Sequence, residues 1–180
     1  MNTPLAPDAQ LAEEEELVAE LEQLDVTYLS RRETQSAPEV RPPERLLADL
    51  VRQPSARVRE AVIALLLAHP EYAAAVPGAL AQLSQIEQTT LRLYYTAAVL
   101  LQGEHAEKLR PRLAARWQPL PDLFSEELGL PRRGSHREQL ARLGGAHRRL
   151  TGAVVNWMGT YENVARHLVR RWELEHQWNR

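Results

Sequence analysis

Hydrophobic residues recur every three or four positions along most of the chain, which is the spacing of one face of an α-helix. The first such segment lies within residues 1–29, where Asp8 can cap the helix and Glu13 to Glu16 lie near its positive end. We therefore expect an acidic amphipathic helix here. Its apolar face is a candidate contact surface for a partner protein, formed by Leu17, Leu21, Leu24 and Tyr28.

Residues 30–43, SRRETQSAPEVRPP, contain three prolines and no apolar period. This composition is typical of an extended linker. The first helix is thus expected on a tether, from which it either folds back on the basic C-terminal region or docks onto a partner as an amphipathic helix in a groove.

The next region, residues 44–130, contains segments that predict helical hairpins. PPERLLADLVRQ predicts a short helix, Gln53-Pro54-Ser55 breaks it, and SARVREAVIALLLAH predicts a second helix that Pro70 ends. A shift of 33 residues superimposes this hairpin on the next, with Leu47 on Leu80 and Leu50 on Leu83. A third unit begins at 107–117 and departs from the pattern at PLPDLFSEELGLP.

The stretch LLADLVRQPSARVREAVIALLLAH resembles a HEAT repeat, in which two antiparallel helices are joined by a Pro-containing turn and the second opens with Val-Arg. The resemblance covers about residues 44–117. It implies stacked hairpins that present a surface to a partner protein or, less often, to nucleic acid. Because the period is shorter than the roughly 40 residues of HEAT repeats, we expect a compact helical domain rather than an extended solenoid.

Residues 131–180 predict two further helices, packed on the same domain. Ser135 and Glu138 form a capping box that opens HREQLARL, and Gly144-Gly145 is expected to end that helix. A long helix is then expected from Ala146 to about Gln177. Its apolar stripe comprises Leu150, Val154, Trp157, Tyr161, Val164, Leu168 and Trp172.

Composition supports an all-α fold, since Ala, Leu, Arg and Glu dominate and aromatic residues are 6%. Cysteine is absent, which excludes disulfides and thiolate metal sites. The first twenty residues lack the apolar core of a signal peptide, and no apolar run reaches the roughly 18 residues of a membrane span. We therefore expect a cytoplasmic protein that does not enter a membrane.

Charge is unevenly distributed. Residues 1–30 hold eight acidic and no basic residues, whereas residues 131–180 hold ten arginines and four glutamates. Arginine and tryptophan are favoured at protein interfaces, so the end of the chain predicts a contact patch formed by Arg170, Arg171, Trp172 and Trp178. The same arginines, with aromatic residues between them, also fit the phosphates and bases of a nucleic acid.

Catalytic motifs are weak. Arg142 with His147, and Arg170 or Arg171 with His176, resemble the Arg-to-His spacing of HEPN-type helical ribonucleases. Among 21 arginines and six histidines, chance supplies about two such matches. No phosphate loop, dinucleotide fingerprint or metalloprotease motif is present, and we predict no catalytic, cofactor or metal site.

The sequence therefore favours a non-enzymatic helical interaction module, an adaptor or a regulatory or inhibitory partner of another protein. Antitoxins, which neutralise a co-expressed enzyme, often carry a tethered segment of this sort, and this is an analogy of fold only. Nucleic-acid binding through the arginine-rich C-terminal helix is the first alternative, and a HEPN-like ribonuclease is the second. Neither the partner nor self-association follows from the sequence.

Overall fold

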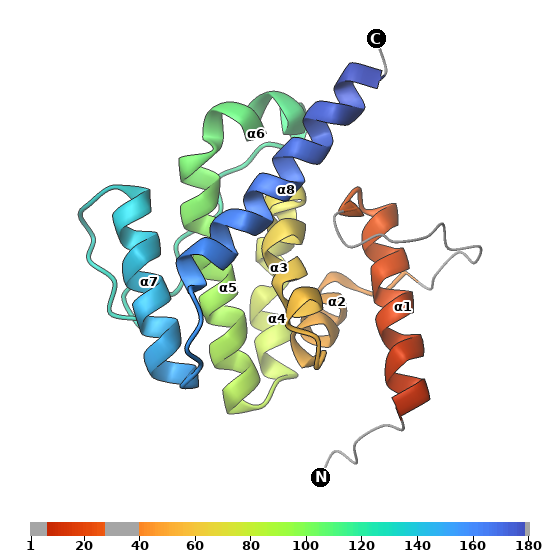
Figure 1. Ribbon diagram of the computed structural model, residues 1–180, viewed down its shortest axis with the longest axis horizontal. Coiled ribbons are helices and arrows are strands. Elements are labelled where there is room, and N and C mark those ends of the chain that lie inside the picture. Colours follow the sequence, from red (N-terminus) through yellow and green to blue (C-terminus); the bar gives the residue numbers. More distant parts are fainter. Residues whose placement is uncertain (1–6, 28–39, 179–180) are drawn as a thin grey trace.

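The computed structural model describes residues 7–27 and 40–178, and the side chains of 9–27 and 40–175 (Figure 1). Within these residues the chain forms helices and turns and no strand, which confirms the predicted all-α fold. The α-helices are α1 Pro7–Gln23, α2 Pro43–Arg52, α3 Ala56–Ala68, α4 Val76–Ala81, α5 Gln85–Glu104, α6 Ala106–Leu113, α7 His136–Thr151 and α8 Trp157–Trp178. Two 3₁₀ helices, η2 Pro70–Ala75 and η3 Ala114–Arg116, complete the described elements.

Helix α3 lies at the centre of the molecule and packs against α2, α5 and α8 (Figure 1). Its residues 61–68 are all buried. The run AVIALLLA is apolar on every face of the helix, and a helix that is apolar all round is typically buried. Helix α7 packs on the far side of α5, and α1 lies at the opposite edge of the molecule, beyond α2 and α3. Helices α1 and α8 thus both contact α3.

The first predicted hairpin is confirmed as α2 and α3. The turn between them is closed by Arg59, which donates to the carbonyl oxygens of Gln53 and Pro54 at 2.6 and 2.7 Å. Helices α4 and α5 follow, and α5 begins with a capping box formed by Ser84 and Glu87. Arg59, in the first turn of α3, therefore satisfies backbone carbonyl groups of the preceding turn.

Helix α1 is joined to the body by apolar packing and by charge. Leu17, Leu21 and Val26 are fully buried in the common core, and Leu24 is partly buried against it. Leu17 and Leu21 are therefore not free to bind a partner, contrary to the prediction that they form a contact surface, and the helix is folded back with its contacts on α3. Tyr28 and most of the predicted linker lie outside the described residues.

The prediction of one long C-terminal helix is wrong, because two helices, α7 and α8, cover this region. Helix α7 runs through the Gly144-Gly145 pair and ends at Gly152, whose φ of 70° is the left-handed conformation of a helix C-cap. Helix α8 then begins after Asn156, whose side-chain oxygen accepts from the Gly159 amide at 3.1 Å. The apolar spacing from Leu150 to Trp157 crosses a turn, and Leu150 and Val154 are exposed.

The segment between η3 and α7 is held on α5 by two buried polar side chains. Gln102 donates to the Gln118 carbonyl at 3.0 Å and accepts from the Leu120 amide at 2.7 Å. The Tyr95 hydroxyl donates to the Pro121 carbonyl at 2.8 Å. These bonds satisfy backbone groups that no regular element pairs.

No described helix is by itself long and apolar enough to cross a membrane. Helix α3 and the following Pro70–Ala81 segment meet that test only as a pair, and the pair is bent by 117°.

Candidate functional site

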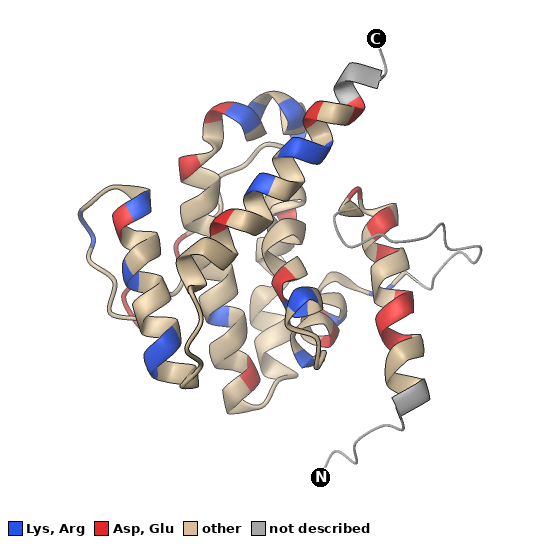
Figure 2. Cartoon of the chain, in the orientation of Figure 1, with Lys and Arg blue, Asp and Glu red and all other residues tan. Residues whose placement is uncertain are grey.

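The outward face of α7 and the loop before it carry exposed arginines (Figure 2). Within the described residues these side chains make no ion pair, and we call them the α7 arginine row: Arg133, Arg137, Arg142, Arg148 and Arg149. The carboxylate of Glu138 lies on the same helix, but it accepts from the Ser135 amide at 2.8 Å in the capping box. That backbone hydrogen bond lowers the pKa of Glu138. The row therefore presents a positive surface.

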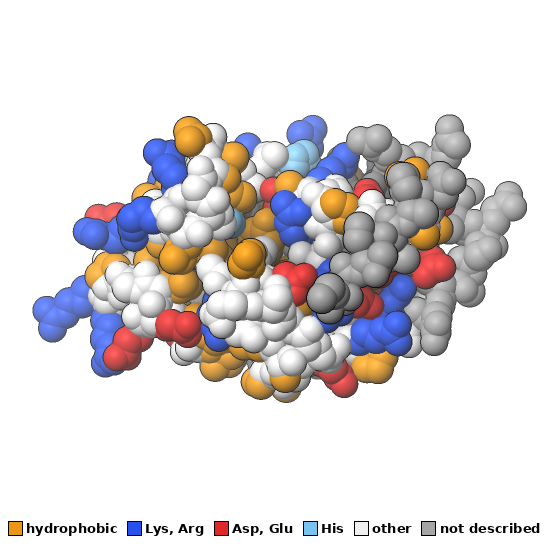
Figure 3. Space-filling model, turned by 90° about the horizontal axis from the view of Figure 1, so that it is seen from below, with side chains coloured by type: hydrophobic (Ala, Val, Ile, Leu, Met, Phe, Trp, Pro, Cys, Tyr) orange, Lys and Arg blue, Asp and Glu red, His pale blue; other side chains and the backbone are white. Residues whose placement is uncertain are grey.

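Exposed aliphatic side chains follow the arginine row directly in the chain. Leu150, Val154 and Val155 are 56%, 86% and 43% exposed, and we call residues 150–155 the apolar turn. Ile86, also exposed, lies in the first turn of α5, which points to the same end of the molecule (Figure 1). In Figure 3 hydrophobic and basic side chains lie side by side at this end. Exposed apolar groups rimmed by polar ones are typical of interaction sites.

The opposite face of α7 is fixed by a buried aromatic cluster. The His147 imidazole is stacked on the Trp157 indole with centroids 3.4 Å apart, and its Nδ1 lies 2.5 Å from the Tyr161 hydroxyl oxygen. The Tyr94 ring meets its edge at 5.8 Å. Burial, and secondarily the charge of Arg59, lower the pKa of His147 to about 4. The ring is therefore neutral near pH 7, and its Nδ1 can accept a hydrogen bond from the Tyr161 hydroxyl.

This cluster joins α7, α8 and α5, and so holds the arginine row and the apolar turn in place.

The position of His147 also bears on the ribonuclease alternative. His147 is 2% exposed, so its ring cannot reach a substrate, and Arg142 points to solvent. The side chain of His176, the other predicted histidine, lies outside the described residues.

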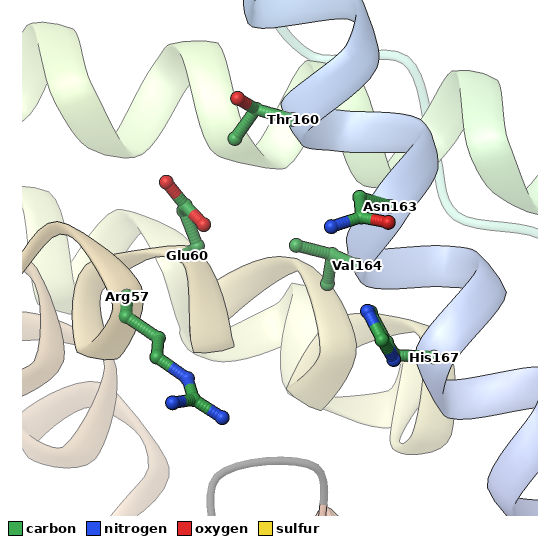
Figure 4. A pocket seen from close by; sticks show the side chains of 6 residues that line it. All are labelled: Arg57, Glu60, Thr160, Asn163, Val164 and His167. Carbon is green, nitrogen blue, oxygen red and sulfur yellow. The ribbon is translucent and has the colours of Figure 1, made fainter.

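A second candidate is a groove of about 340 Å³ between the first turns of α3 and the first half of α8 (Figure 4). It is lined by Arg57, Glu60, Thr160, Asn163, Val164 and His167. Glu60 points between the two helices, and burial raises the pKa of its carboxyl, against the opposing effect of Arg59 and Arg57. The sequence pattern missed this groove, because its residues are far apart in the chain and follow no motif.

The predicted C-terminal patch is not assembled as expected. Trp172 is only 5% exposed, packed with the core and covered by Arg112, whose guanidinium lies 5.4 Å from the indole centroid. Arg171 is exposed and pairs with Glu175 at 3.1 Å, and Arg170 is exposed. The Trp178 side chain lies outside the described residues. Trp172 is therefore a core residue, because its stripe on α8 faces α3 and α6.

The chain was compared with protein-family models, curated proteins and solved structures. None of them matches it. Within the described residues, no group of three or more His, Asp or Glu side chains is arranged to hold a metal ion. The two candidate surfaces thus rest on the geometry of this chain, the α7 arginine row with the apolar turn on one side and the α3–α8 groove on the other.

Proposed function

We propose that this protein is a non-enzymatic interaction module, an adaptor or regulatory partner, and that it binds an acidic amphipathic segment of another protein. The observation that supports the proposal is the α7 arginine row, without an ion pair in the described structure, directly beside the exposed aliphatic side chains of the apolar turn. A segment with carboxylates along one side and an apolar residue at its end is complementary to both features.

The two features contribute in different ways. Each exposed arginine–carboxylate pair is worth roughly 0.2–1 kcal/mol, whereas full burial of a side chain such as Val154 is worth about 1.5–3 kcal/mol. We therefore expect the apolar turn to supply most of the affinity. The arginine row is expected to raise the association rate and to set the orientation of the partner.

A protein partner fits this surface better than a nucleic acid does. Single-stranded nucleic acids are bound by stacking bases on exposed aromatic rings. Within the described residues, the exposed large hydrophobic side chains are all aliphatic, and the tryptophans are buried or half-buried. Phosphate contacts alone would also leave Val154 and Val155 without a role.

The body of the molecule fits the same proposal. Helices α2 and α3 form the hairpin whose sequence resembles a HEAT repeat, and α4–α5 follow it after a 33-residue shift. Hairpins of that family act as rigid supports for binding surfaces. In this proposal α3 and α5 are the support on which α7 is displayed.

The proposal is tested by charge reversal with a matched control. Tagged wild type is compared with Arg137→Glu/Arg142→Glu/Arg149→Glu, with Val154→Asp, and with Arg166→Glu/Arg170→Glu, which changes exposed arginines of α8 instead. Each is used to recover partners from nuclease-treated native extract at about 0.15 M salt. A second arm measures binding of a single-stranded RNA oligonucleotide.

We expect one protein, in equal amount with wild type and the α8 variant, to be lost with both the α7 variant and Val154→Asp. Recovery of that protein by all four chains would remove α7 from the interface. If the RNA binds and only the α7 arginine variant abolishes this, the row is a phosphate-binding surface and the proposed function is wrong.

A further inference from the structure

The groove between α3 and α8 holds the carboxylate of Glu60, on which Arg59 and Arg57 act electrostatically. Within the described part of the chain, the side chain of Glu60 makes no hydrogen bond and no ion pair. Arg59 is adjacent in sequence, but its guanidinium donates to the carbonyls of Gln53 and Pro54. The guanidinium of Arg57 points away from Glu60 in Figure 4.

Glu60 is half-buried, and this partial burial favours pairing of its carboxylate with a cation. Burial raises the pKa of Glu60, and the negative charge of Glu60 in turn helps burial to raise the pKa of the underlying Tyr94 to about 12. A charge that is partly desolvated and unpaired gains more from an opposite charge than one in bulk water does.

Besides the basic side chains of Arg57 and His167, the lining offers polar and apolar groups for an organic cation. Thr160 lies above Glu60 and Asn163 to one side of it, with the Asn163 amide nitrogen turned toward the groove and its oxygen away (Figure 4), and neither side chain is hydrogen-bonded within the described residues. Val164, 3% exposed, gives the groove an apolar floor for methylene groups. The volume of about 340 Å³ is near the lower end of small-ligand sites.

We propose that the α3–α8 groove is a second binding site, which takes a guanidinium or ammonium group on a short aliphatic stem and pairs it with Glu60. The Thr160 hydroxyl accepts from a remaining N–H group, the Asn163 amide does so once its oxygen has turned toward Glu60, and the stem lies on Val164. This site does not depend on the α7 surface, since Glu60, Thr160 and Asn163 belong to α3 and α8.

Three probes test the site by amide chemical shifts of the full chain. They are agmatine, the peptide acetyl-Gly-Gly-Arg-Gly-Gly-amide, and the same peptide with citrulline, which keeps the shape and removes the charge. We expect agmatine and the arginine peptide to shift amides near residues 60 and 160–167, and the citrulline peptide to leave them unchanged. Agmatine binding alone indicates a free small molecule, and peptide binding indicates an arginine side chain of a protein.

Two variants decide the role of Glu60. Glu60→Gln should raise the Kd of agmatine about tenfold, because the charge pair is lost, whereas Glu104→Gln, an exposed glutamate at the end of α5, should leave it unchanged. Asn163→Asp adds a carboxylate at an exposed position and should lower the Kd about threefold. The site is refuted if citrulline binds like arginine, or if Glu60→Gln and Asn163→Asp both leave the Kd within about twofold.

Discussion

The imidazole of His147 lies flat on the indole of Trp157, with the ring centroids 3.4 Å apart and the planes within 8°. The two residues come from different helices, α7 and α8, and the stack closes the hairpin that carries the arginine row. Because the ring is buried between aromatic neighbours, its protonation opposes folding.

Acid should therefore destabilise the protein through His147. The pKa is about 4 in the folded state and about 6.5 in the unfolded state, so between these values the unfolded chain binds a proton that the folded chain does not. The stabilisation is fully present above about pH 6.5 and is lost as the pH falls toward 4. Urea unfolding at about pH 7.5 and 4.5 should show a loss of roughly 2–3 kcal/mol from this group.

His147→Phe is the control for that measurement. Phenylalanine keeps a ring on Trp157 but cannot be protonated, so the variant should lose less stability between the two pH values than the wild type does. Its lower stability at neutral pH, from the unpaired Tyr161 hydroxyl, is common to both conditions. Equal losses in wild type and variant would show that other groups cause the acid sensitivity.

Gly144 and Gly145 offer a matched pair of substitutions in α7. A methyl group at Gly144 would lie 3.1 Å from the Met158 backbone nitrogen, whereas at Gly145 it would meet only the flexible end of Arg149, at 3.5 Å. Gly144→Ala should destabilise by about 1–3 kcal/mol, because α8 must move. Gly145→Ala should stabilise by about 0.5–1 kcal/mol, because glycine is a poor helix former. Thermal unfolding with the two variants shifted in the same direction would contradict this packing.

This pair also shows where sequence reasoning succeeded and where it failed. The helix start at Ser135 and the α2–α3 hairpin were predictable, since capping residues and prolines act locally. The Gly144-Gly145 pair predicts the end of a helix, and this prediction is wrong. Yet the low helix propensity of glycine is outweighed here, because a residue without a side chain lets the first turn of α8 approach.

The candidate sites were harder to predict than the helices. Exposed aromatic anchors were expected near the end of the chain, but the same three- and four-residue spacing buries Trp172. Periodicity shows which residues share a face and does not show what covers that face. The groove at Glu60 required residues about 100 positions apart in the sequence to meet, which no local pattern reports.

Trp172 and its neighbour Arg171 should respond differently to truncation. Trp172→Ala removes a buried indole under Arg112 and should cost about 3–5 kcal/mol. Arg171→Ala removes an exposed side chain with one surface ion pair, and the change should stay within about 0.5 kcal/mol. Denaturant midpoints of the two variants check this prediction. A Trp172→Ala protein as stable as the wild type would show that Trp172 is not part of the core.

Arg41 should be essential for attachment of α1. Its backbone amide and guanidinium both donate to the Glu20 carboxylate at 2.7 Å, and the guanidinium also lies 3.3 Å from Asp49 of α2. Burial alone would lower the pKa of Arg41, but Glu20 and Asp49 together raise it above its ordinary value. Glu20 is 2% exposed, so Arg41→Ala would leave a buried carboxylate without its cation.

Such a loss costs about 3–5 kcal/mol in comparable buried pairs. We therefore expect Arg41→Ala to lower global stability and to expose the amides of α1 to hydrogen exchange, because α1 loses the ion pair through which Arg41 links Glu20 to Asp49 of α2. Arg45→Ala is the matched control, since Arg45 reaches the same Asp49 at 3.4 Å from a mostly exposed position. If α1 exchanges equally slowly in both variants, apolar packing alone holds the helix and the charge network is dispensable.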